Sequence, residues 1–307
     1  MVAGPGSVRL LLAVVLAELL LGPAAGLSAS SESSHPRTAY AGLGTWLSIY
    51  AKRAWRNPER QVAAMAQDGI RTLYLETGNY KQRADLVRPQ ALGRFIDAAH
   101  AAGLRVVAWY LPSFANLPRD ERRAVAAIRF RSASGERFDG FALDIEATVV
   151  RAIRLRDRRL LQLSARLRRD VGPRYALGAI TPSPIGMSPT YWPRMPYRTL
   201  ARYYAVFLPM AYSTDRGAHG SNATRSYLSA TVAAIRSAAG NPKIPIHLIG
   251  GLSGAMGATE TAGFLRAVAA CGPLGYSLYA FPGTSPATWT ALTAPLPTPT
   301  ARERRCT

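Results

Sequence analysis

Eight short runs of β-branched and aromatic residues alternate with helical patterns along the chain, and this alternation restricts the possible folds more than any other feature. Two helical segments, 57–69 and 88–103, begin near a proline and end at a glycine, and a third, 258–272, also ends at a glycine. The expected strands are GTWLSIY (44–50), IRTLYLET (70–77), LRVVAWYLP (104–112), FDGFALDIE (138–146), YALGAIT (175–181), YYAVFLPMAY (203–212), IPIHLIGGL (244–252) and GYSLYAF (275–281).

This order of elements favours a parallel sheet with right-handed crossovers. Eight strand–helix units fit a closed (βα)8 TIM barrel, which usually needs about 250 residues. The alternative, a doubly wound open sheet, normally carries a glycine-rich phosphate loop after its first strand, and SIYAKRAW (48–55) contains no glycine. We therefore predict an α/β protein with a single (βα)8 barrel domain over residues 41–294.

Both ends of the chain are expected to lie outside this barrel. Arg9 precedes the apolar run 10–21, and small residues follow at 24–26, so residues 1–26 are predicted to form a secretory signal peptide. The polar segment 27–40 and the basic tail 295–307 are expected to be disordered. The mature protein would then be secreted, with no membrane partner after cleavage.

The charge of the chain is strongly positive. Its net charge is +20, with 38 basic and 18 acidic residues. A secreted protein of this charge is attracted to polyanions, so anionic cell-wall polymers are expected partners and the cell wall is an expected location. No nucleic-acid-binding motif accompanies the charge, and no nucleic-acid partner is predicted.

The two cysteines, Cys271 and Cys306, leave two interpretations open. Export would permit a disulfide between them, whereas a buried Cys271 beside a free Cys306 is the alternative. Neither cysteine has CxxC spacing, and the four histidines have no clustered acids beside them, so we predict no metal site and no cofactor.

The fourth expected strand carries two acids, Asp144 and Glu146, in an otherwise apolar or small-residue run. Residues two apart share a strand face, so both acids point away from Phe141, Leu143 and Ile145 and toward the barrel mouth. Active sites of TIM barrels lie at this end of the strands. A neighbouring anion and partial burial raise a carboxyl pKa, which suits a general acid. The alternative is an ion pair with an arginine that braces the barrel.

The same strand resembles the D-G-x-D-x-D-x-E motif of the family 18 glycoside hydrolases, the chitinases and related enzymes. Asp139, Gly140, Asp144 and Glu146 match it, and Ala142 replaces the middle aspartate.

Two further segments also resemble this family. Met210-Ala211-Tyr212-Ser213 is similar to its M-x-Y-D, with Ser213 in place of the aspartate, and GYSLY is similar to its eighth strand, with Tyr279 where a tryptophan would stand.

The resemblance implies a role for each matching residue. Glu146 would be the general acid, while Asp144 and Tyr212 would hold the acetamido group of a substrate that assists its own cleavage. Family 25 muramidases also have D-x-E on a barrel strand, but the aspartate of their first strand is missing from GTWLSIY.

Further candidates for the barrel mouth come from the other expected strands and the loops after them. Glu76 ends the second strand and is a candidate second carboxylate, and Asp215 is a candidate replacement for the carboxylate missing at Ser213. Trp109 and Tyr110 have opposite parity, so at most one of them faces inward. The predicted substrate-binding residues are Glu76, Tyr279, Trp109, Trp46 and Asp215. His247 is interpreted as a core histidine.

The sequence therefore predicts a secreted glycoside hydrolase that acts on an extracellular or cell-wall polysaccharide or oligosaccharide. Its catalytic residues would be Glu146, Asp144 and Tyr212. The alternative is a non-catalytic glycan-binding barrel attached to the cell wall, which the replacements at Ala142, Ser213 and Tyr279 would favour.

Overall fold

The computed structural model describes residues 1, 37–301 and 306, and residues 37–301 and 306 belong to one compact unit. Its parallel strands pair in sequence order and close into a barrel. The strands are β1 Gly42–Leu47, β2 Thr72–Asn79, β3 Arg105–Leu111, β4 Gly140–Asp144, β5 Leu177–Pro182, β6 Val206–Met210, β7 His247–Leu252 and β8 Gly275–Tyr279. The predicted single-domain (βα)8 barrel is confirmed.

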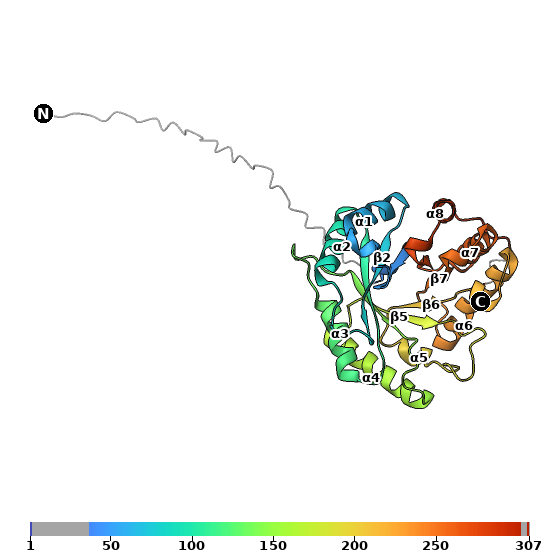
Figure 1. Cartoon of the computed structure of the whole chain (residues 1–307), viewed down its shortest axis with the longest axis horizontal. Coiled ribbons are helices and arrows are strands. Elements are labelled where there is room, and N and C mark those ends of the chain that lie inside the picture. The colour runs from blue at the N-terminus through green and yellow to red at the C-terminus, as the bar shows by residue number, and fades with distance from the viewer. Residues whose placement is uncertain (2–36, 302–305, 307) are drawn as a thin grey trace. The chain divides into compact units, whose positions relative to one another are not determined.

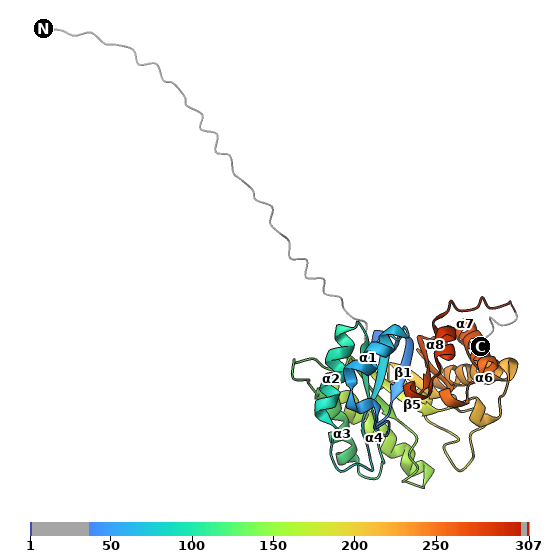
Figure 2. The same cartoon turned by 45° about the horizontal axis from the view of Figure 1, so that its top comes forward.

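Helices follow the strands and surround the barrel in both views (Figures 1 and 2). They are α1 Pro58–Gln67, α2 Pro89–Ala101, α3 Leu117–Arg129, α4 Ile153–Val171, α5 Tyr197–Leu200, α6 Ser221–Ala239, α7 Ala258–Cys271 and α8 Pro286–Thr293. Short 3-10 turns complete the fold at η1 Thr38–Tyr40, η2 Ala54–Arg56, η3 Thr214–Arg216, η4 Ser253–Ala255 and η5 Phe281–Gly283. Within the described residues, no helix has the length and apolar character that crossing a membrane requires.

The alternation of side chains along β4 separates two hydrophobic layers. Phe141, Leu143 and Ile145 pack in the layer between the strands and the helices, whereas Ala142 lies in the cluster inside the barrel. The strand itself is shorter than the expected run 138–146 and ends at Asp144, although the Ile145 N–H still donates to the Ile180 carbonyl. Glu146 therefore lies in the loop directly after β4.

A network of aromatic and polar side chains fills the base of the barrel. Imidazole Nδ1 of His247 lies 2.9 Å from both the Tyr40 carbonyl and the Tyr74 hydroxyl, and Nε2 lies 2.9 Å from the Ser277 hydroxyl. The indole N–H of Trp46 donates to the same Ser277 oxygen at 2.8 Å. These contacts fit a neutral imidazole with its proton on Nδ1. His247 is thus a core histidine, as interpreted from the sequence.

Tyr40 reaches this network from η1, at the end of the segment 27–40 that was expected to be disordered. Its hydroxyl donates to the carbonyls of Phe141 at 2.8 Å and Ala176 at 2.9 Å, and its side chain is fully buried. Residues 37–40 therefore belong to the barrel, because Tyr40 fills space that no strand residue occupies. Apart from Met1, the predicted signal peptide 1–26 and the rest of the segment lie outside the described residues.

Glycines provide the space for this network. A Cβ atom at Gly275 would lie 2.2 Å from the Tyr40 carbonyl oxygen and 2.4 Å from His247 Nδ1. A Cβ atom at Gly178 would lie 2.8 Å from the Tyr40 ring. Side chains at these positions would displace the aromatic residues that fill the base.

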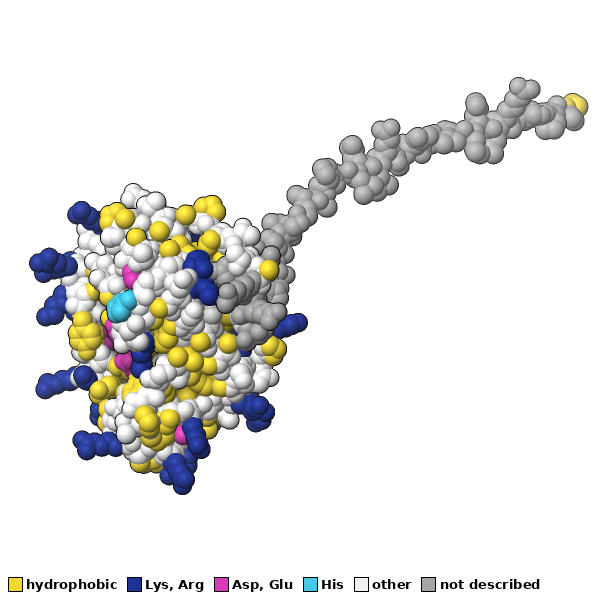
Figure 3. Space-filling model, turned by 90° about the vertical axis from the view of Figure 1, so that its right-hand side faces the viewer, with side chains coloured by type: hydrophobic (Ala, Val, Ile, Leu, Met, Phe, Trp, Pro, Cys, Tyr) yellow, Lys and Arg dark blue, Asp and Glu magenta, His cyan; other side chains and the backbone are white. Residues whose placement is uncertain are grey.

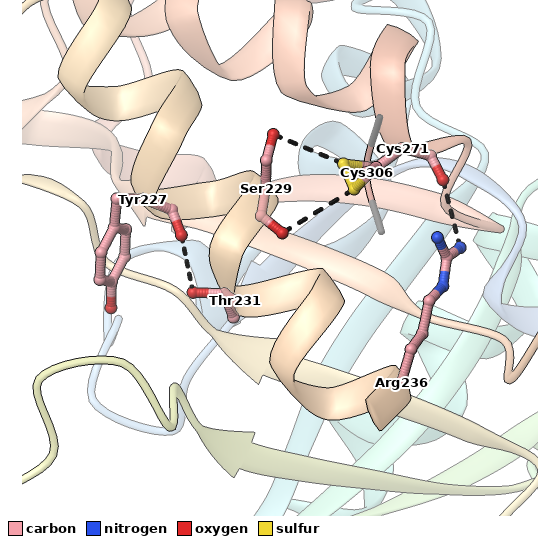
Figure 4. Close-up of a disulfide and its surroundings, with 6 residues drawn as sticks. All are labelled: Tyr227, Ser229, Thr231, Arg236, Cys271 and Cys306. Carbon is pink, nitrogen blue, oxygen red and sulfur yellow. Dashed lines mark hydrogen bonds between the residues drawn. A yellow bond between two sulfur atoms is a disulfide. The ribbon is translucent and has the colours of Figure 1, made fainter. Parts of the chain in front are cut away.

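The structure resolves the question of the cysteines in favour of a disulfide. Cys271, at the end of α7, is bonded to Cys306. Figure 4 shows Ser229 of α6 beside both sulfur atoms, with its hydroxyl 3.5 Å from Cys271 Sγ and its carbonyl oxygen 3.8 Å from Cys306 Sγ. The tail 295–307, expected to be disordered, therefore has a fixed point at the buried Cys306. Residues 302–305 and 307 lie outside the described residues.

On the face shown in Figure 3, many Lys and Arg side chains project outward and few Asp or Glu side chains appear.

Removal of the disulfide should lower the stability of the protein. The bridge spans 35 residues, and the loss of loop closure should cost about 3 to 4 kcal/mol in the variant Cys306→Ser. Denaturant unfolding of the oxidised protein and the variant measures this difference. Under reducing conditions the two proteins should unfold at similar denaturant concentrations; an unchanged difference there would contradict the assignment to the disulfide.

The network at the base should make stability depend on pH through His247. The ordinary pKa of a histidine is 6.5, and burial lowers the pKa of His247 to about 4. The hydrogen bond to the Tyr40 carbonyl opposes this shift by a smaller amount. Below pH 6.5 the unfolded chain takes up a proton on His247 that the folded protein excludes. The contribution of His247 to the free energy of unfolding therefore falls as the pH drops from 6.5 to about 4. The total loss is about 3 kcal/mol.

A His247→Gln variant isolates this effect. We expect the unfolding free energy of the parent, minus that of the variant, to decrease by about 3 kcal/mol on going from pH 7 to pH 4 in denaturant titrations. A difference that stays constant over this range would show that His247 does not exclude the proton.

Candidate active site

A cavity of about 560 Å³ opens at the carboxyl ends of the strands. It is lined by residues from the ends of β2, β3, β4, β6, β7 and β8 and from the loops that follow β1, β2, β4 and β6. Six of the eight side chains predicted to form the site line it, namely Glu76, Trp109, Asp144, Glu146, Tyr212 and Tyr279. The barrel therefore brings residues from five strands or strand ends to one place.

Asp144 is the last residue of β4 and points into the barrel, as the strand parity predicts. Its side chain is only 5% exposed, and its Oδ1 has no hydrogen-bond partner among the described residues. Burial raises the pKa of Asp144 well above its ordinary value, and the nearby charges of Glu146 and Glu76 raise it further. Asp144 therefore tends to retain a proton, and one of its carboxyl oxygens is unpaired.

Glu146 lies two residues after Asp144 and is partly buried. Its backbone carbonyl accepts a hydrogen bond of 2.8 Å from the Tyr191 hydroxyl, which fixes the start of the loop after β4. Burial raises the pKa of the Glu146 carboxyl. Within the described residues, neither Asp144 nor Glu146 forms an ion pair with an arginine, so a bracing ion pair is not what holds these two acids.

Glu76 supplies a third carboxyl from β2. It is 2% exposed; its Oε2 accepts from the Ile49 N–H at 2.9 Å and its Oε1 from the Asn79 amide at 3.1 Å. Burial raises the pKa of Glu76 to about 7, the two hydrogen bonds oppose this, and the charge of Glu146 adds to the increase. The three carboxyls thus influence one another across a single cavity.

Two phenols complete the cavity opposite these acids. Tyr212 follows β6, Tyr279 ends β8, and the centres of their rings are 6.3 Å apart. Burial raises the pKa of Tyr279 to about 12. It also raises the pKa of Tyr212 well above its ordinary value, with a further contribution from the charge of Asp144. Both hydroxyls therefore keep their protons near neutral pH and can donate hydrogen bonds.

Trp109 and Tyr110 face opposite sides of β3, as parity requires. Trp109 belongs to the cluster inside the barrel and lines the cavity, and Tyr110 belongs to the layer beneath the helices. The indole N–H of Trp109 is buried and has no acceptor among the described residues. Trp109 thus lines the same cavity as the acids with an unpaired indole donor.

Trp46 does not lie where the sequence interpretation placed it. Its ring stacks on Tyr74, with 4.2 Å between ring centres, and is 2% exposed. It does not line the cavity, because β1 ends at Leu47 rather than at Tyr50 and Trp46 sits lower in the barrel than expected. Trp46 supports the site from below.

Asp215 also lies outside the cavity. It is exposed in η3, while Ser213 is buried and donates its hydroxyl hydrogen bond to the Gly250 carbonyl at 3.3 Å. The loop turns at Ser213 and carries Asp215 to the surface, so Asp215 does not bring a replacement carboxylate into the cavity.

Several lining residues were missed by the sequence interpretation. Tyr50 comes from the loop after β1, and Asn79, Tyr80 and Lys81 come from the end of β2 and the loop after it. The expected second strand stopped at Thr77, whereas β2 continues to Asn79 through a register shift. The polar run Asn79–Lys81 directly after a strand was the available signal.

The described residues contain no group of three or more His, Cys, Asp or Glu side chains arranged to hold a metal ion.

No protein family profile and no curated protein sequence matches the chain. Its structure is similar to several solved barrels. A chitinase from Chromobacterium violaceum has a TM-score of 0.57 and 14% identity over 82% of this chain and 98% of that one. An endo-β-1,4-mannanase from Thermotoga petrophila has a TM-score of 0.58 and 10% identity over 78% of this chain and 68% of that one.

The spore cortex-lytic enzyme SleL of Bacillus cereus gives a TM-score of 0.58 at 9% identity, over 82% of this chain and 73% of that one. At these identities the likeness shows the fold, and the expected distant resemblance to glycoside-hydrolase barrels is confirmed at that level.

The cavity predicts a second pH effect on stability, through Glu76. Its pKa of about 7 lies above the ordinary 4.5, so the folded protein keeps a proton that the unfolded chain releases as pH rises between these values. Wild-type stability should therefore lose about 3 kcal/mol over this window.

A Glu76→Gln variant should not lose stability in this way, because glutamine has no proton to release. Its unfolding free energy, relative to wild type, should rise by about 3 kcal/mol between pH 4.5 and pH 7 and then level off. The exposed Glu59→Gln is the matched control, and its difference from wild type should not rise in this window. A flat difference for Glu76→Gln would contradict the raised pKa.

Proposed function

We propose that this protein is a glycoside hydrolase that cleaves a polysaccharide or oligosaccharide, with Glu146 as the general acid. The observation that carries the proposal is the juxtaposition of Asp144, Glu146 and Tyr212 in one cavity at the carboxyl end of the barrel. The cavity volume of about 560 Å³ is in the range of small-molecule and cofactor sites, so sugar units fit the space in principle.

The electrostatics of the cavity support the acid role. A glycosidic oxygen is a poor leaving group until it receives a proton, and the donor must still hold that proton near neutral pH. Burial raises the pKa of Glu146, which favours retention of its proton near neutral pH. Asp144 and Glu76 line the same cavity, and either carboxyl, once it has released its proton, stabilises the positive charge that develops on the sugar ring in the transition state.

The second group in the reaction depends on the sugar. With a 2-acetamido sugar, Asp144 and the neutral Tyr212 hydroxyl would orient the acetamido group, whose carbonyl oxygen attacks the anomeric carbon. With a sugar that lacks this group, Glu76 on β2 is the carboxylate of the cavity lining that can serve as nucleophile or base. Loss of activity in Glu76→Gln with conserved activity in Asp144→Asn would identify the second route.

Secretion and a cell-wall substrate are part of the proposal. The predicted signal peptide supports export, and the Cys271–Cys306 disulfide is typical of proteins in an oxidising compartment, which also supports it. The net charge of +20 favours retention near anionic wall polymers. Because the structural neighbours include a chitinase, an endo-β-1,4-mannanase and a spore cortex-lytic enzyme, chitin, β-1,4-mannan and spore-cortex glycan are the first substrates to examine.

A non-catalytic glycan-binding barrel is the second candidate. It is favoured by Ala142, which leaves Asp144 Oδ1 without the carboxyl neighbour present in the family 18 motif, and by Ser213, whose hydroxyl is turned to Gly250. This candidate predicts saturable binding of a glycan without release of reducing ends.

Replacement of the general acid should abolish hydrolysis while leaving the fold intact. We expect Glu146→Gln to lower kcat at least about a hundredfold, because the amide cannot transfer a proton. The measurement is release of new reducing ends from chitin, β-1,4-mannan and cortex peptidoglycan, with the thermal unfolding midpoint recorded in parallel.

The isosteric control is Glu59→Gln, an exposed glutamate on α1 that pairs with Arg94 at 2.6 Å. It should keep full activity. Hydrolysis that persists at the parent rate in Glu146→Gln would refute the assignment, and glycan binding without hydrolysis by the parent would favour the non-catalytic barrel.

A further inference from the structure

Two neighbouring loops on one side of the cavity carry a cluster of exposed cations. They are the loop 48–57 after β1 and the loop 80–88 after β2, and these strands pair directly. We call the cluster the basic platform; its members are Lys52, Arg53, Arg56, Lys81 and Arg83, all exposed and none in an ion pair within the described residues.

Acidic residues do not neutralise the platform. The only acid in these two loops is Asp85. Its carboxylate is engaged by α3, with Arg122 Nε at 2.8 Å and Arg123 Nε at 3.5 Å. The five cations therefore face solvent without a local counter-charge from their own loops.

The first loop is held in place by its backbone. The Ile49 N–H donates to Glu76, and its carbonyl accepts from the Arg88 guanidinium at 3.0 Å. The Trp55 indole donates to the Ser48 carbonyl at 2.8 Å, and the Arg88 guanidinium lies 5.3 Å from the centre of the Trp55 ring. These contacts order the loop before any ligand binds.

The second loop is held by a buried arginine. Arg123 is 2% exposed and donates to the carbonyls of Asn79 at 2.9 Å, Gln82, and Arg83 at 3.2 Å. The Lys81 N–H donates to the Asn79 side-chain oxygen at 3.0 Å. A preorganised loop loses less conformational entropy on binding, so its charges contribute more to affinity than those of a mobile tail.

The platform is continuous with the cavity. Lys81 lines the cavity together with Tyr50 and Tyr80, and its ammonium lies 5.7 Å from the centre of the Tyr80 ring. Tyr50 is 60% exposed and accepts a hydrogen bond of 2.9 Å from the Asn79 amide. A ligand that leaves the cavity on this side passes two aromatic rings and then the cations.

We propose that the basic platform binds the anionic groups of an acidic polysaccharide whose neighbouring, uncharged sugar occupies the cavity. The inference rests on the proposed function and adds the charge class and the orientation of the substrate. An anion inside the cavity would meet Glu76, Asp144 and Glu146, whereas an anion on the platform meets only cations. The chain therefore distinguishes a neutral sugar at the acids from a charged sugar beside it.

This division of charge also disfavours a nucleic acid. Every nucleotide carries a phosphate, so a strand that followed the platform into the cavity would place negative charge next to the three carboxyls. A polysaccharide with anionic groups on only some of its sugars avoids this repulsion.

The test is a binding measurement on a catalytically silent background. In Glu146→Gln, the five platform residues are changed to Gln, and a matched variant carries Arg71, Arg129, Arg137, Arg174 and Arg202 changed to Gln. These control arginines are exposed and lie at the ends of helices or in loops at the opposite end of the barrel, and the change in net charge is the same. Thermal unfolding midpoints verify that both variants fold.

The probes are a partially methyl-esterified polygalacturonate, which carries anionic groups on only some of its sugars and is called polygalacturonate below, its fully methyl-esterified neutral form, a wall teichoic acid and a DNA duplex. Polygalacturonate should bind the Glu146→Gln protein, the parent of both variants, in a salt-dependent manner, and the neutral form should bind it more weakly. The platform variant should lose at least about tenfold in affinity for polygalacturonate, since five modest ion pairs act together, while the control variant should stay within about threefold. Lys81→Gln alone should give a smaller loss in the same direction.

Three other results overturn part or all of the inference, and a fourth separates it from the proposed function. Equal losses in the two variants would show that affinity follows net charge and not the platform. Platform-dependent binding that is tightest for DNA would replace the glycan with a nucleic acid. Preference for teichoic acid over polygalacturonate would keep the platform and assign phosphate as its anion. Platform-dependent glycan binding, together with a wild-type protein that hydrolyses none of the glycans, would sustain this inference and refute the proposed function.

Discussion

The parallel pairing of β8 with β1 closes the barrel, and the rest of the structure depends on that closure. A closed barrel has an interior that only alternate residues of each strand reach. At the base, Tyr40, Tyr74 and His247 fill this interior, in space left by glycines such as Gly275. Above them the interior opens into the cavity. The acids lie at the top because the base is already filled with aromatic rings.

Closure also explains the unusual state of the acids. Three carboxyls on β2 and around the end of β4 converge on one cavity without an arginine among its lining residues. Placing them there costs free energy, since burial and mutual repulsion disfavour their charged forms. The barrel supplies this free energy from its packed layers. In return, the cavity contains carboxyls that keep protons in the range where general acids operate.

Strand periodicity predicted much of the molecule. Because side chains alternate strictly, the sequence placed Asp144 inside and Leu143 outside, and it required that at most one of Trp109 and Tyr110 face inward, without any knowledge of distant contacts. Depth in the barrel was predicted less well. Trp46 has the expected parity, but its height follows from the point at which β1 stops pairing with β2, which is a property of two segments.

The positions of the loops were even harder to predict from local sequence, because they depend on contacts between distant segments. Residues 79–83 are held by Arg123, which lies 40 residues from Arg83 and 44 from Asn79 in the chain. The loop after β4 is held by Tyr191. No local pattern contains these contacts. The platform was therefore visible in the sequence only as a general excess of arginine and lysine. The disulfide likewise required the approach of α7 and the tail, which two cysteine positions do not establish.

Tyr40 has a consequence for how the chain can be divided. It precedes every strand, yet its hydroxyl bonds the backbone of Phe141 and Ala176 and its carbonyl contacts His247 on β7. A shortened protein that began at Gly42 would keep all eight strands and still lack the tyrosine side chain that fills the base of the barrel. The smallest complete version of this fold therefore includes a residue that belongs to none of its strand–helix repeats.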